Sequence, residues 1–374
     1  MADSLLEHFA DLPDPRHARG RLHRLSDLLA IAISAVVCGA DGWVAVEHFA
    51  RAKEKWSATF LDLGGGVPSH DTFGRVFAAI DPDAFERCFL AWTKALGGPA
   101  GGKLVAIDGK SLRRSFAHAW DRSGMAHLVS AFVSENRLVL GQLAVDAKEN
   151  EIVAIPKLLA LLDLAGATVS IDAIGCQRDV ARGIRDAGAQ YVLAVKENQK
   201  TLHTQVKRLL DEAVLERFEG LAHDARQETD GGHGRIETRR VWCTSEVHWL
   251  KCAGDWPGLG CVGVVECVRE VIGGAASTER RYYISSLDGT DAKALAAAVR
   301  GHWGVENPLH WSLDVTFGED DSRVRKGNAA QNLSRLRRIA LNQLQRETTL
   351  KVGIGVKRQR AGWDHDYLLR VLAT

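Results

Sequence analysis

The stretch Lys-Leu-Val-Ala-Ile-Asp-Gly, residues 103–109, is an unbroken apolar run that ends in an aspartate and a glycine. Such a run is typical of a strand covered on both faces of its sheet. The same pattern recurs in Ala-Thr-Val-Ser-Ile-Asp-Ala-Ile-Gly, residues 167–175. Open α/β sheets bind ligands beyond the carboxyl ends of their strands. We therefore predict that Asp108 and Asp172 form half of a metal site.

The order of the elements that follow the glycine-rich linker 97–102 indicates the fold. Three strands come first, and then two helices alternate with two strands. This β-β-β-α-β-α-β order is that of an α/β protein with a ribonuclease-H-like core, a mixed five-stranded sheet with flanking helices. In that arrangement the strands ending in Asp108 and Asp172 are parallel neighbours. The predicted strands are 104–108, 127–134, 137–145, 168–172 and 190–195, with helical spacing at 155–162 and 180–187.

The remaining segments surround or interrupt this core. The N-terminal part reads as short helices between tight breaks, which fits a helix-turn-helix-like DNA-binding module and a supporting helical bundle about equally well. A β-rich insertion follows the fifth strand, and a helix carrying Glu306 then resumes the core. We predict five segments: 1–98 helical, 103–200 first part of the core, 201–290 insertion, 291–347 second part of the core, and 348–374 basic tail.

Composition excludes several classes of protein. The 374 residues are 46% hydrophobic and 25% charged, with a net charge of +1, as in an ordinary globular protein. Seven cysteines without a Cys-x-x-Cys pair argue against a zinc ribbon or a disulfide framework. The apolar run 28–40 is too short to span a bilayer and is predicted to be a buried helix. With no export signal recognised, we expect a cytoplasmic protein, associated with the nucleoid when bound to DNA.

The chemistry expected of the site is phosphoryl transfer. Carboxylate and phosphate oxygens are the donors that Mg²⁺ or Mn²⁺ prefers. Two ions ~3.5–4 Å apart activate a hydroxyl nucleophile and stabilise the leaving oxygen. The sequence contains no phosphate-binding loop of ATPases, no dinucleotide fingerprint and no Gly-x-Ser-x-Gly elbow. Each aspartate taken alone is more often a turn former or a helix cap.

Glu306 is predicted to be the third carboxylate, because Trp303, His310 and Trp311 place it among semi-buried residues. Asp314 and Glu319–Asp321 are competing candidates, and the latter read as a solvated turn. Pro308 lacks an N–H group and predicts a kink or a helix end just after Glu306. His302 and His310 have no matching third ligand, so we predict supporting or core roles for them.

Basic residues cluster after the first aspartate and in two later segments. Lys and Arg side chains that neutralise phosphates supply most non-specific affinity for DNA. Solvated surface charge is an equally good reading of each cluster taken singly. In the helix 328–346, the arginines at 335, 337, 338 and 346 are predicted to face outward. The candidate DNA-binding residues are Lys110, Arg113, Arg114, Arg235, Arg239, Arg323, Arg325 and Lys326.

Three motifs carry a family resemblance: Ala-Ile-Asp-Gly-Lys at 106–110, Ser-Ile-Asp-Ala-Ile-Gly-Cys-Gln at 170–177, and His-Trp-Gly-Val-Glu-Asn-Pro-Leu-His-Trp-Ser-Leu-Asp-Val at 302–315. Over nearly its whole length the chain resembles the insertion-sequence DDE transposases of the ISAs-one group, which includes the H-repeat-associated proteins. Further matching motifs are Leu-Pro-Asp-Pro-Arg at 12–16, Pro-Ser-His-Asp-Thr-Phe at 68–73, His-Gly-Arg-Ile-Glu-Thr-Arg at 233–239, and Arg-Ala-Gly-Trp-Asp at 360–364.

The resemblance implies a catalytic triad of Asp108, Asp172 and Glu306, two Mg²⁺ or Mn²⁺ ions, and cut-and-join chemistry at inverted-repeat ends. Residues 1–98 would be the family's associated domain. The expected partner is double-stranded DNA, both terminal inverted repeats and target, bound by a homodimer. The wider group often carries Tyr, Arg and Lys around the glutamate, where this chain has Val299, His302 and Leu313. The resemblance therefore predicts nothing about a DNA hairpin intermediate.

Two other functions fit the same residues. One is a catalytically silent DNA-binding remnant of a transposon, for which Pro308 beside the glutamate would be a mark of decay. The other is a non-transposing nuclease on a ribonuclease-H-like fold, which would cut DNA without joining it. Activity on the element's own ends separates these alternatives from a working transposase.

Overall fold

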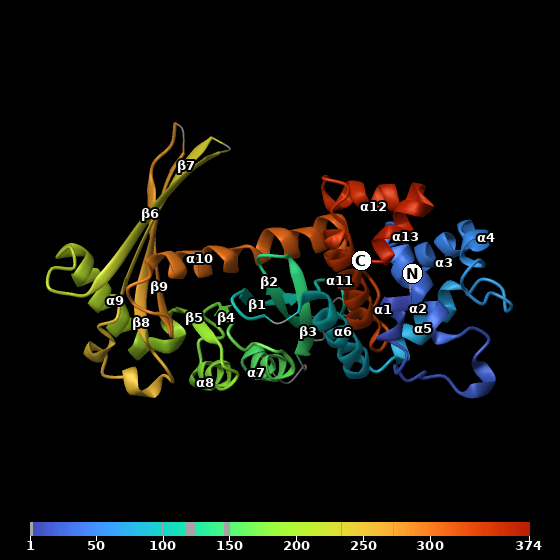
Figure 1. Ribbon diagram of the computed structural model, residues 1–374, viewed down its shortest axis with the longest axis horizontal. Coiled ribbons are helices and arrows are strands. Elements are labelled where there is room, and N and C mark those ends of the chain that lie inside the picture. The colour runs from blue at the N-terminus through green and yellow to red at the C-terminus, as the bar shows by residue number, and fades with distance from the viewer. Residues whose placement is uncertain (1–2, 99, 117–124, 146–149, 233, 272) are drawn as a thin grey trace.

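The computed structural model describes residues 3–98, 100–116, 125–145, 150–232, 234–271 and 273–374. The molecule is elongated, with a sheet running through its middle and one end, and a helical lobe at the other end (Figure 1). The sheet has nine strands in the order β3-β2-β1-β4-β5-β9-β8-β7-β6. The strands are β1 Leu104–Ser111, β2 His127–Val133, β3 Leu138–Val145, β4 Thr168–Ile171, β5 Gln190–Val195, β6 His223–Gly232, β7 Arg235–Thr244, β8 Cys261–Val271 and β9 Ser277–Ser285.

Strand β1 is the centre of the first half of the sheet. It pairs antiparallel with β2 and parallel with β4, and β4 pairs parallel with β5. The parallel pairing of β1 and β4 is the one the sequence predicts. Its register ends at Ile107 opposite Ile171, so Asp108 and Asp172 follow the same rung of the ladder. The two aspartates therefore come from neighbouring strands at one edge of the sheet.

The second half of the sheet is formed by the segment predicted to be a β-rich insertion. Strand β9 pairs antiparallel with β5 and continues into β8, β7 and β6, so the insertion extends the sheet. A bare β5 would expose a row of unpaired backbone groups, which β9 covers. The outer ends of β6, β7, β8 and β9 project away from the body, and these four strands are called the arm (Figure 1). Strand β6 escaped the sequence analysis because its residues are almost all polar and exposed.

Helices cover both faces of the sheet. On one face α7 and α8 share a core with β1, β4 and β5, and α9 extends that core under β8 and β9. On the other face α10 packs against β1, β5 and the inner residues of the arm strands. In Figure 1 α10 runs lengthwise from beside the arm toward the centre of the molecule. These helices are α7 Glu151–Leu161, α8 Arg178–Asp186, α9 Lys200–Leu215 and α10 Ala292–Trp303.

The N-terminal helices share one hydrophobic core with the C-terminal helices. Ser69 caps α5 as the sequence predicts, because its side chain accepts a hydrogen bond from Thr72 N. Within the described ranges, the helices are too short or too polar to cross a bilayer. The helices of this lobe are α1 Asp3–Glu7, α2 Leu25–Val37, α3 Trp43–Ala52, α4 Glu54–Ser57, α5 His70–Ala79, α6 Pro82–Gly97, α11 Ala329–Arg346, α12 Ile354–Trp363 and α13 His365–Leu372.

Helix α11 corrects the prediction of outward-facing arginines for three of the four, while Arg346 is exposed as predicted. Arg335, Arg337 and Arg338 are at most 3% exposed, because α2, α5, α6 and β3 enclose the helix. Arg335 Nε lies 2.7 Å from Glu86 Oε2, and Arg338 Nη1 lies 3.1 Å from Glu319 Oε1. Glu319 is itself buried, which corrects the reading of Glu319–Asp321 as a solvated turn at its first residue, whereas Asp321 is exposed. Buried arginines persist where such carboxylates and hydrogen bonds offset their lost hydration.

Candidate functional site

The three predicted carboxylates, Asp108, Asp172 and Glu306, line one hollow of about 300 Å³. Asp108 lies in β1 just past its pairing with β4, and Asp172 directly follows β4. Glu306 comes from the segment that continues α10, which crosses behind the sheet. Residues far apart in the sequence thus meet at the carboxyl ends of β1 and β4, where open sheets bind their ligands.

Glu306 stands at the start of a π-helix, Val305–Thr316, that follows α10. Pro308 has no N–H group to donate, so an α-helical hydrogen bond cannot form there. The sequence predicts a kink or a helix end at this point, whereas the chain remains helical with a wider turn. Single π segments in helices are frequent at functional sites.

The π-helix aligns its side chains with alternate residues of β1. His310 Nε2 lies 3.3 Å from Asp108 Oδ2, and Lys110 Nζ lies 2.5 Å from Asp314 Oδ1. Residues four apart on the helix therefore face residues two apart on the strand, which point to the same side of the sheet. Although close, His310 Nε2 lacks the orientation of a hydrogen bond to Asp108. The wide turn of the π-helix thus places Glu306 and His310 near the strand that carries Asp108.

Asp108 lies in an electrostatically unfavourable place for a bare carboxylate. Burial raises its pKa to about 7, and the negative charges of Asp172, Glu151 and Glu306 add to the shift. Glu151, at the start of α7, is a fourth carboxylate that the sequence analysis missed, since only the fold brings it close. Its Oε1 lies 2.5 Å from His127 Nε2. The site concentrates negative charge, which a bound cation would offset.

Two half-buried histidines flank the aspartates. His302 Nδ1 lies 3.2 Å from Ser170 Oγ, and burial lowers the pKa of His302 despite the nearby Asp172. Burial, together with Arg338 and Lys110, lowers the pKa of His310 to about 4. Both rings are therefore neutral at pH 7 and add no positive charge to the site, in keeping with the supporting roles predicted for them.

The donor set fits a hard divalent cation in its chemistry. Carboxylate oxygens from Asp108, Asp172 and Glu306 are the ligands that Mg²⁺ and Mn²⁺ prefer. In the part of the chain that the structure describes, however, no three or more His, Cys, Asp or Glu side chains are gathered closely enough to hold an ion. The three carboxylates line the hollow without converging on a single point.

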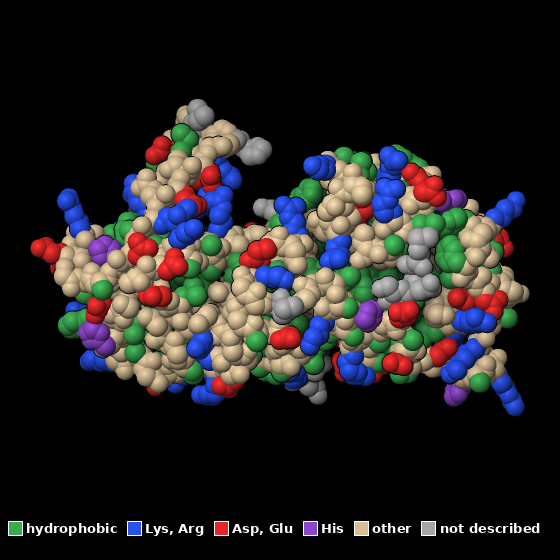
Figure 2. Space-filling view, viewed as in Figure 1, with side chains coloured by type: hydrophobic (Ala, Val, Ile, Leu, Met, Phe, Trp, Pro, Cys, Tyr) green, Lys and Arg blue, Asp and Glu red, His purple; other side chains and the backbone are tan. Residues whose placement is uncertain are grey.

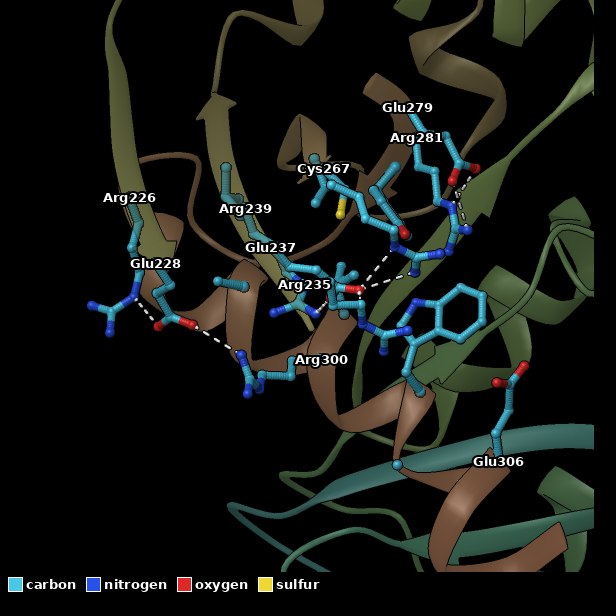
Figure 3. A pocket seen from close by; sticks show the side chains of 18 of the residues that line it. Arg226, Glu228, Arg235, Glu237, Arg239, Cys267, Glu279, Arg281, Arg300 and Glu306 are labelled. Carbon is cyan, nitrogen blue, oxygen red and sulfur yellow. Dashed lines mark hydrogen bonds and ion pairs between the residues drawn. The ribbon is translucent and has the colours of Figure 1, made fainter. Parts of the chain in front are cut away.

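A second hollow, of about 520 Å³, opens from the first toward the arm (Figure 3). The two share a wall that includes Arg281, Trp303 and Glu306. Six arginines and four glutamates line the second hollow, so its net charge is positive. Arg235 and Arg239 were predicted as DNA-binding residues. The other arginines were not predicted, because positive and negative residues alternate along the strands and form no basic cluster in the sequence. The lining arginines are Arg226, Arg235, Arg239, Arg269, Arg281 and Arg300.

Glutamates hold these arginines along the groove. Glu237 pairs with Arg235, Arg239 and Arg269, and Glu228 pairs with Arg226 and Arg300. Figure 3 shows the labelled arginines spread around the hollow, with Arg226 on the side farthest from Glu306. Figure 2 shows Lys and Arg side chains along the flank of the arm, beside the notch that separates it from the helical lobe.

The other predicted DNA-binding residues lie on a different part of the molecule. Arg113 and Arg114 are exposed and pair with Asp320 and Asp321. Arg325 Nε donates to the carbonyl oxygen of Arg114 at 2.8 Å, so two clusters that are separate in sequence are neighbours. Arg323, Arg325 and Lys326 line a surface hollow together with residues of α5.

Lys110 differs from the prediction. It is only 8% exposed, and its ammonium group is held by Asp314 at 2.5 Å and Asp320 at 3.4 Å. It cannot contact a phosphate without leaving two carboxylates, because a buried lysine keeps its charge only when paired. The structure therefore assigns Lys110 to the support of the π-helix.

Comparison with known proteins agrees with these features. The family described as "Transposase DDE domain" matches residues 99–343, and the one described as "DDE_Tnp_1-associated" matches residues 6–93. The chain is 40% identical to the "Putative transposase YncI" of Escherichia coli O157:H7, over 99% of this chain and 95% of that protein. It is 38% identical to the "H repeat-associated putative transposase YhhI" of Escherichia coli K12, over 99% and 97% of the two chains.

Among solved structures, the piggyBac transposase in a synaptic complex with hairpin DNA covers 99% of this chain and 76% of its own, with 11% identity and a TM-score of 0.42. A TM-score this low does not establish a shared fold.

Proposed function

Since the chain belongs to the family of transposases with a DDE domain, we propose that it cuts DNA at the ends of its own mobile element and joins those ends to target DNA. The catalytic residues would be Asp108, Asp172 and Glu306. One observation carries this proposal: the three carboxylates, far apart in sequence, line one hollow at the carboxyl ends of β1 and β4.

The five strands β3-β2-β1-β4-β5 would form a ribonuclease-H-like core. In this assignment residues 103–200 and 291–347 build the core, 201–290 are the insertion, and 348–374 are the basic tail. Residues 1–98 would be the associated domain that contributes to DNA binding. Support comes from the parallel pairing of β1 with β4 and from the return of the chain to the site through α10.

Asp108, Asp172 and Glu306 would together hold Mg²⁺ or Mn²⁺, and we propose two ions. When bound, such ions activate the attacking hydroxyl and stabilise the leaving 3′ oxygen. The chain's own carboxylates supply oxygen donors and excess negative charge. His302 and His310, neutral at pH 7, lie beside the two aspartates and add no positive charge there. Water would free the 3′ end of the element, and that 3′ hydroxyl would attack target DNA without a covalent protein intermediate.

The duplex would lie along the arginine groove and reach the carboxylates at its inner end. Arg235 and Arg239 on the arm would contact phosphates there. Arg113, Arg114, Arg323, Arg325 and Lys326 form a second, separate surface that would contact another part of the DNA. Two such surfaces on one chain suit a homodimer that holds two element ends and a target.

The experiment is strand cleavage and joining on DNA that carries the element's terminal inverted repeats, with Mg²⁺. The wild-type protein is expected to nick at the ends and to join them to a target plasmid. Asp108→Asn, Asp172→Asn and Glu306→Gln are each expected to bind the same DNA but to release no cut strand. Cleavage that persists in all three variants would refute the triad. Cutting without joining would identify a nuclease, and binding without cutting by the wild type a silent remnant.

A further inference from the structure

The hollow that holds the three carboxylates is also lined by cations. Lys196, Arg280 and Arg281 all contribute to its wall. Arg280 is occupied by Asp211 and Glu266, and Arg281 pairs with Glu279 and stacks on Trp303. Lys196, by contrast, lies within ion-pairing distance of none of the carboxylates that the structure describes. Arg281 and, more weakly, Lys196 lower the pKa of Glu279, but Glu279 forms its ion pair with Arg281, so the ammonium group of Lys196 can still bind a ligand.

Lys196 leaves the sheet at the same edge as Asp172, on the next strand and two residues farther along. Asp172 directly follows β4, and Lys196 directly follows β5. The two strands pair in parallel, with Ile171 opposite Leu193, so both residues leave the sheet at the same edge. The sequence analysis passed over Lys196 because the strand 190–195 carries no acidic residue at its end.

The loop that begins at Lys196 is fastened to the loop that begins at Asp172. Asn198 Nδ2 donates to Ala173 O at 2.6 Å, and Gln199 Nε2 donates to Cys176 O at 3.0 Å. A third bond joins Gln199 Nε2 to Gln177 Oε1 at 3.1 Å. Side chains thus hold the two loops together. The backbone of Lys196 is fixed relative to Asp172, while its exposed side chain remains free to move.

We propose that Lys196 binds a non-bridging oxygen of the DNA phosphodiester beside the three carboxylates. This assignment rests on the proposed function, because it takes DNA as the ligand. A cluster of carboxylates repels a phosphate, and an ammonium group on a fixed stretch of backbone offsets that repulsion as a point charge with three donors. Lys196 thereby orients the phosphate and transfers no proton.

The test compares Lys196→Ala, Lys196→Arg and Lys200→Ala in the strand-cleavage assay. Lys200 lies four residues later at the start of α9 and does not line the hollow, so it controls for loss of surface charge. Lys196→Ala is expected to lower kcat/KM by roughly 10- to 100-fold, the effect of one hydrogen bond to a charged group. Lys196→Arg is expected to recover most of the loss, and Lys200→Ala to cleave like the wild type.

A neutral methylphosphonate placed at each phosphate near the cut in turn locates the contact. At one position the methylphosphonate is expected to slow cleavage by the wild type about as much as Lys196→Ala does. At that position it should not slow the Lys196→Ala variant any further. A Lys196→Ala variant as active as the wild type would overturn this assignment alone. It would also be overturned if, at every phosphate tested, the methylphosphonate slowed Lys196→Ala by as large a factor as it slows the wild type. A wild type that cuts no DNA would overturn the proposed function, and this assignment with it. Equal thermal unfolding of the variants shows that they fold.

Discussion

Helix α11 and the arm of strands β6–β9 are both rich in arginine, yet the arginines of the two regions are in opposite environments. In α11 the side chains of Arg335 and Arg338 are 3% and 1% exposed, and each faces one buried carboxylate. In the groove beside the arm, the side chains of Arg239 on β7 and Arg300 on α10 are 31% and 56% exposed, and they share Asp230. Glu237 there is shared by three arginines. The first set ties the helical lobe to the sheet, while the second leaves a net positive groove.

The difference shows that the number of basic residues in a segment does not identify a DNA-binding surface. What matters is whether each guanidinium has a carboxylate of its own and whether water reaches it. A buried, individually paired arginine is committed to the fold. An exposed arginine that shares its carboxylate keeps charge that a phosphate can neutralise. Four predictions test this contrast. They are ordered from the largest expected change in stability to the smallest, and the last concerns DNA binding.

Replacing a buried arginine should cost the most. Arg338→Met leaves Glu319 without its ion-pair partner, although the Glu319 side chain is 0% exposed. The free energy of unfolding should therefore fall by about 3–5 kcal/mol. Arg300→Met, on the side of α10 that lines the groove, should change it by no more than about 0.5 kcal/mol. Urea unfolding measures both. The double variant Arg338→Met with Glu319→Leu should regain part of the loss. Equal effects of the two single variants would remove the distinction between the regions.

The carboxylate site should make the metal-free protein less stable at high pH. In the unfolded chain an aspartate has a pKa of about 3.9, whereas that of Asp108 in the fold is about 7. Because the raised pKa means that the folded state binds the proton more tightly, this contribution is complete below pH ~4 and is lost as pH rises through ~7. The loss is at most about 4 kcal/mol.

Asp108→Asn should therefore flatten this dependence and stabilise the protein at pH 8. Urea unfolding in EDTA at pH 5 and pH 8 measures the difference for both proteins. A variant with the same difference between the two pH values as the wild type would show that Asp108 is not the titrating group.

Lys110 and Arg113, three residues apart, should behave in opposite ways. Lys110→Met removes the cation held by Asp314 and should cost about 1–3 kcal/mol of stability with little change in DNA affinity. Arg113→Met, at a side chain 79% exposed, should leave stability unchanged and weaken DNA binding. Unfolding curves measure the stability of each variant, and binding isotherms on one DNA duplex measure its affinity. Weaker DNA binding by a fully stable Lys110→Met would restore the original prediction from sequence.

The arm arginines should affect binding but hardly stability. Arg235→Ala and Arg269→Ala should each lower the slope of log affinity against log salt by about 0.9, the value for one phosphate contact. Arg208→Ala provides a control, since Arg208 is 77% exposed on α9 and does not line the groove. Fluorescence anisotropy across a salt series gives the slopes. A control that lowers the slope equally would show that the groove has no special role.

The sequence was informative where a side-chain pattern is set by local structure. Unbroken apolar runs located β1, β4 and β5, and the aspartates that end two of them lie side by side. The parallel pairing of β1 and β4 followed from the order of the elements. Motif resemblance pointed to Glu306, which lines the same hollow. These features depend on strand period and on chain order, both of which are readable without coordinates.

The sequence was uninformative where burial is decided by packing between distant segments. The polar residues of β6 gave no alternating pattern, since that strand is exposed on both faces. The sequence pattern makes helix α11 appear amphipathic, with its arginines facing outward. In the structure, α2, α5, α6 and β3 bury Arg335, Arg337 and Arg338. The proximity of Glu151 to Asp108, and of Lys196 to the carboxylates, depends on which loops the fold brings together.

The central claim is that Asp108, Asp172 and Glu306 share divalent cations. The most direct measurement is Mn²⁺ binding followed by electron paramagnetic resonance, on the wild type and on Asp172→Asn, with the element-end DNA bound. The account predicts that the wild type takes up Mn²⁺ and that the variant, still bound to DNA, loses at least about tenfold in Mn²⁺ affinity, the effect of losing one charged ligand interaction. Equal Mn²⁺ uptake by the two proteins, or none by the wild type, would contradict it.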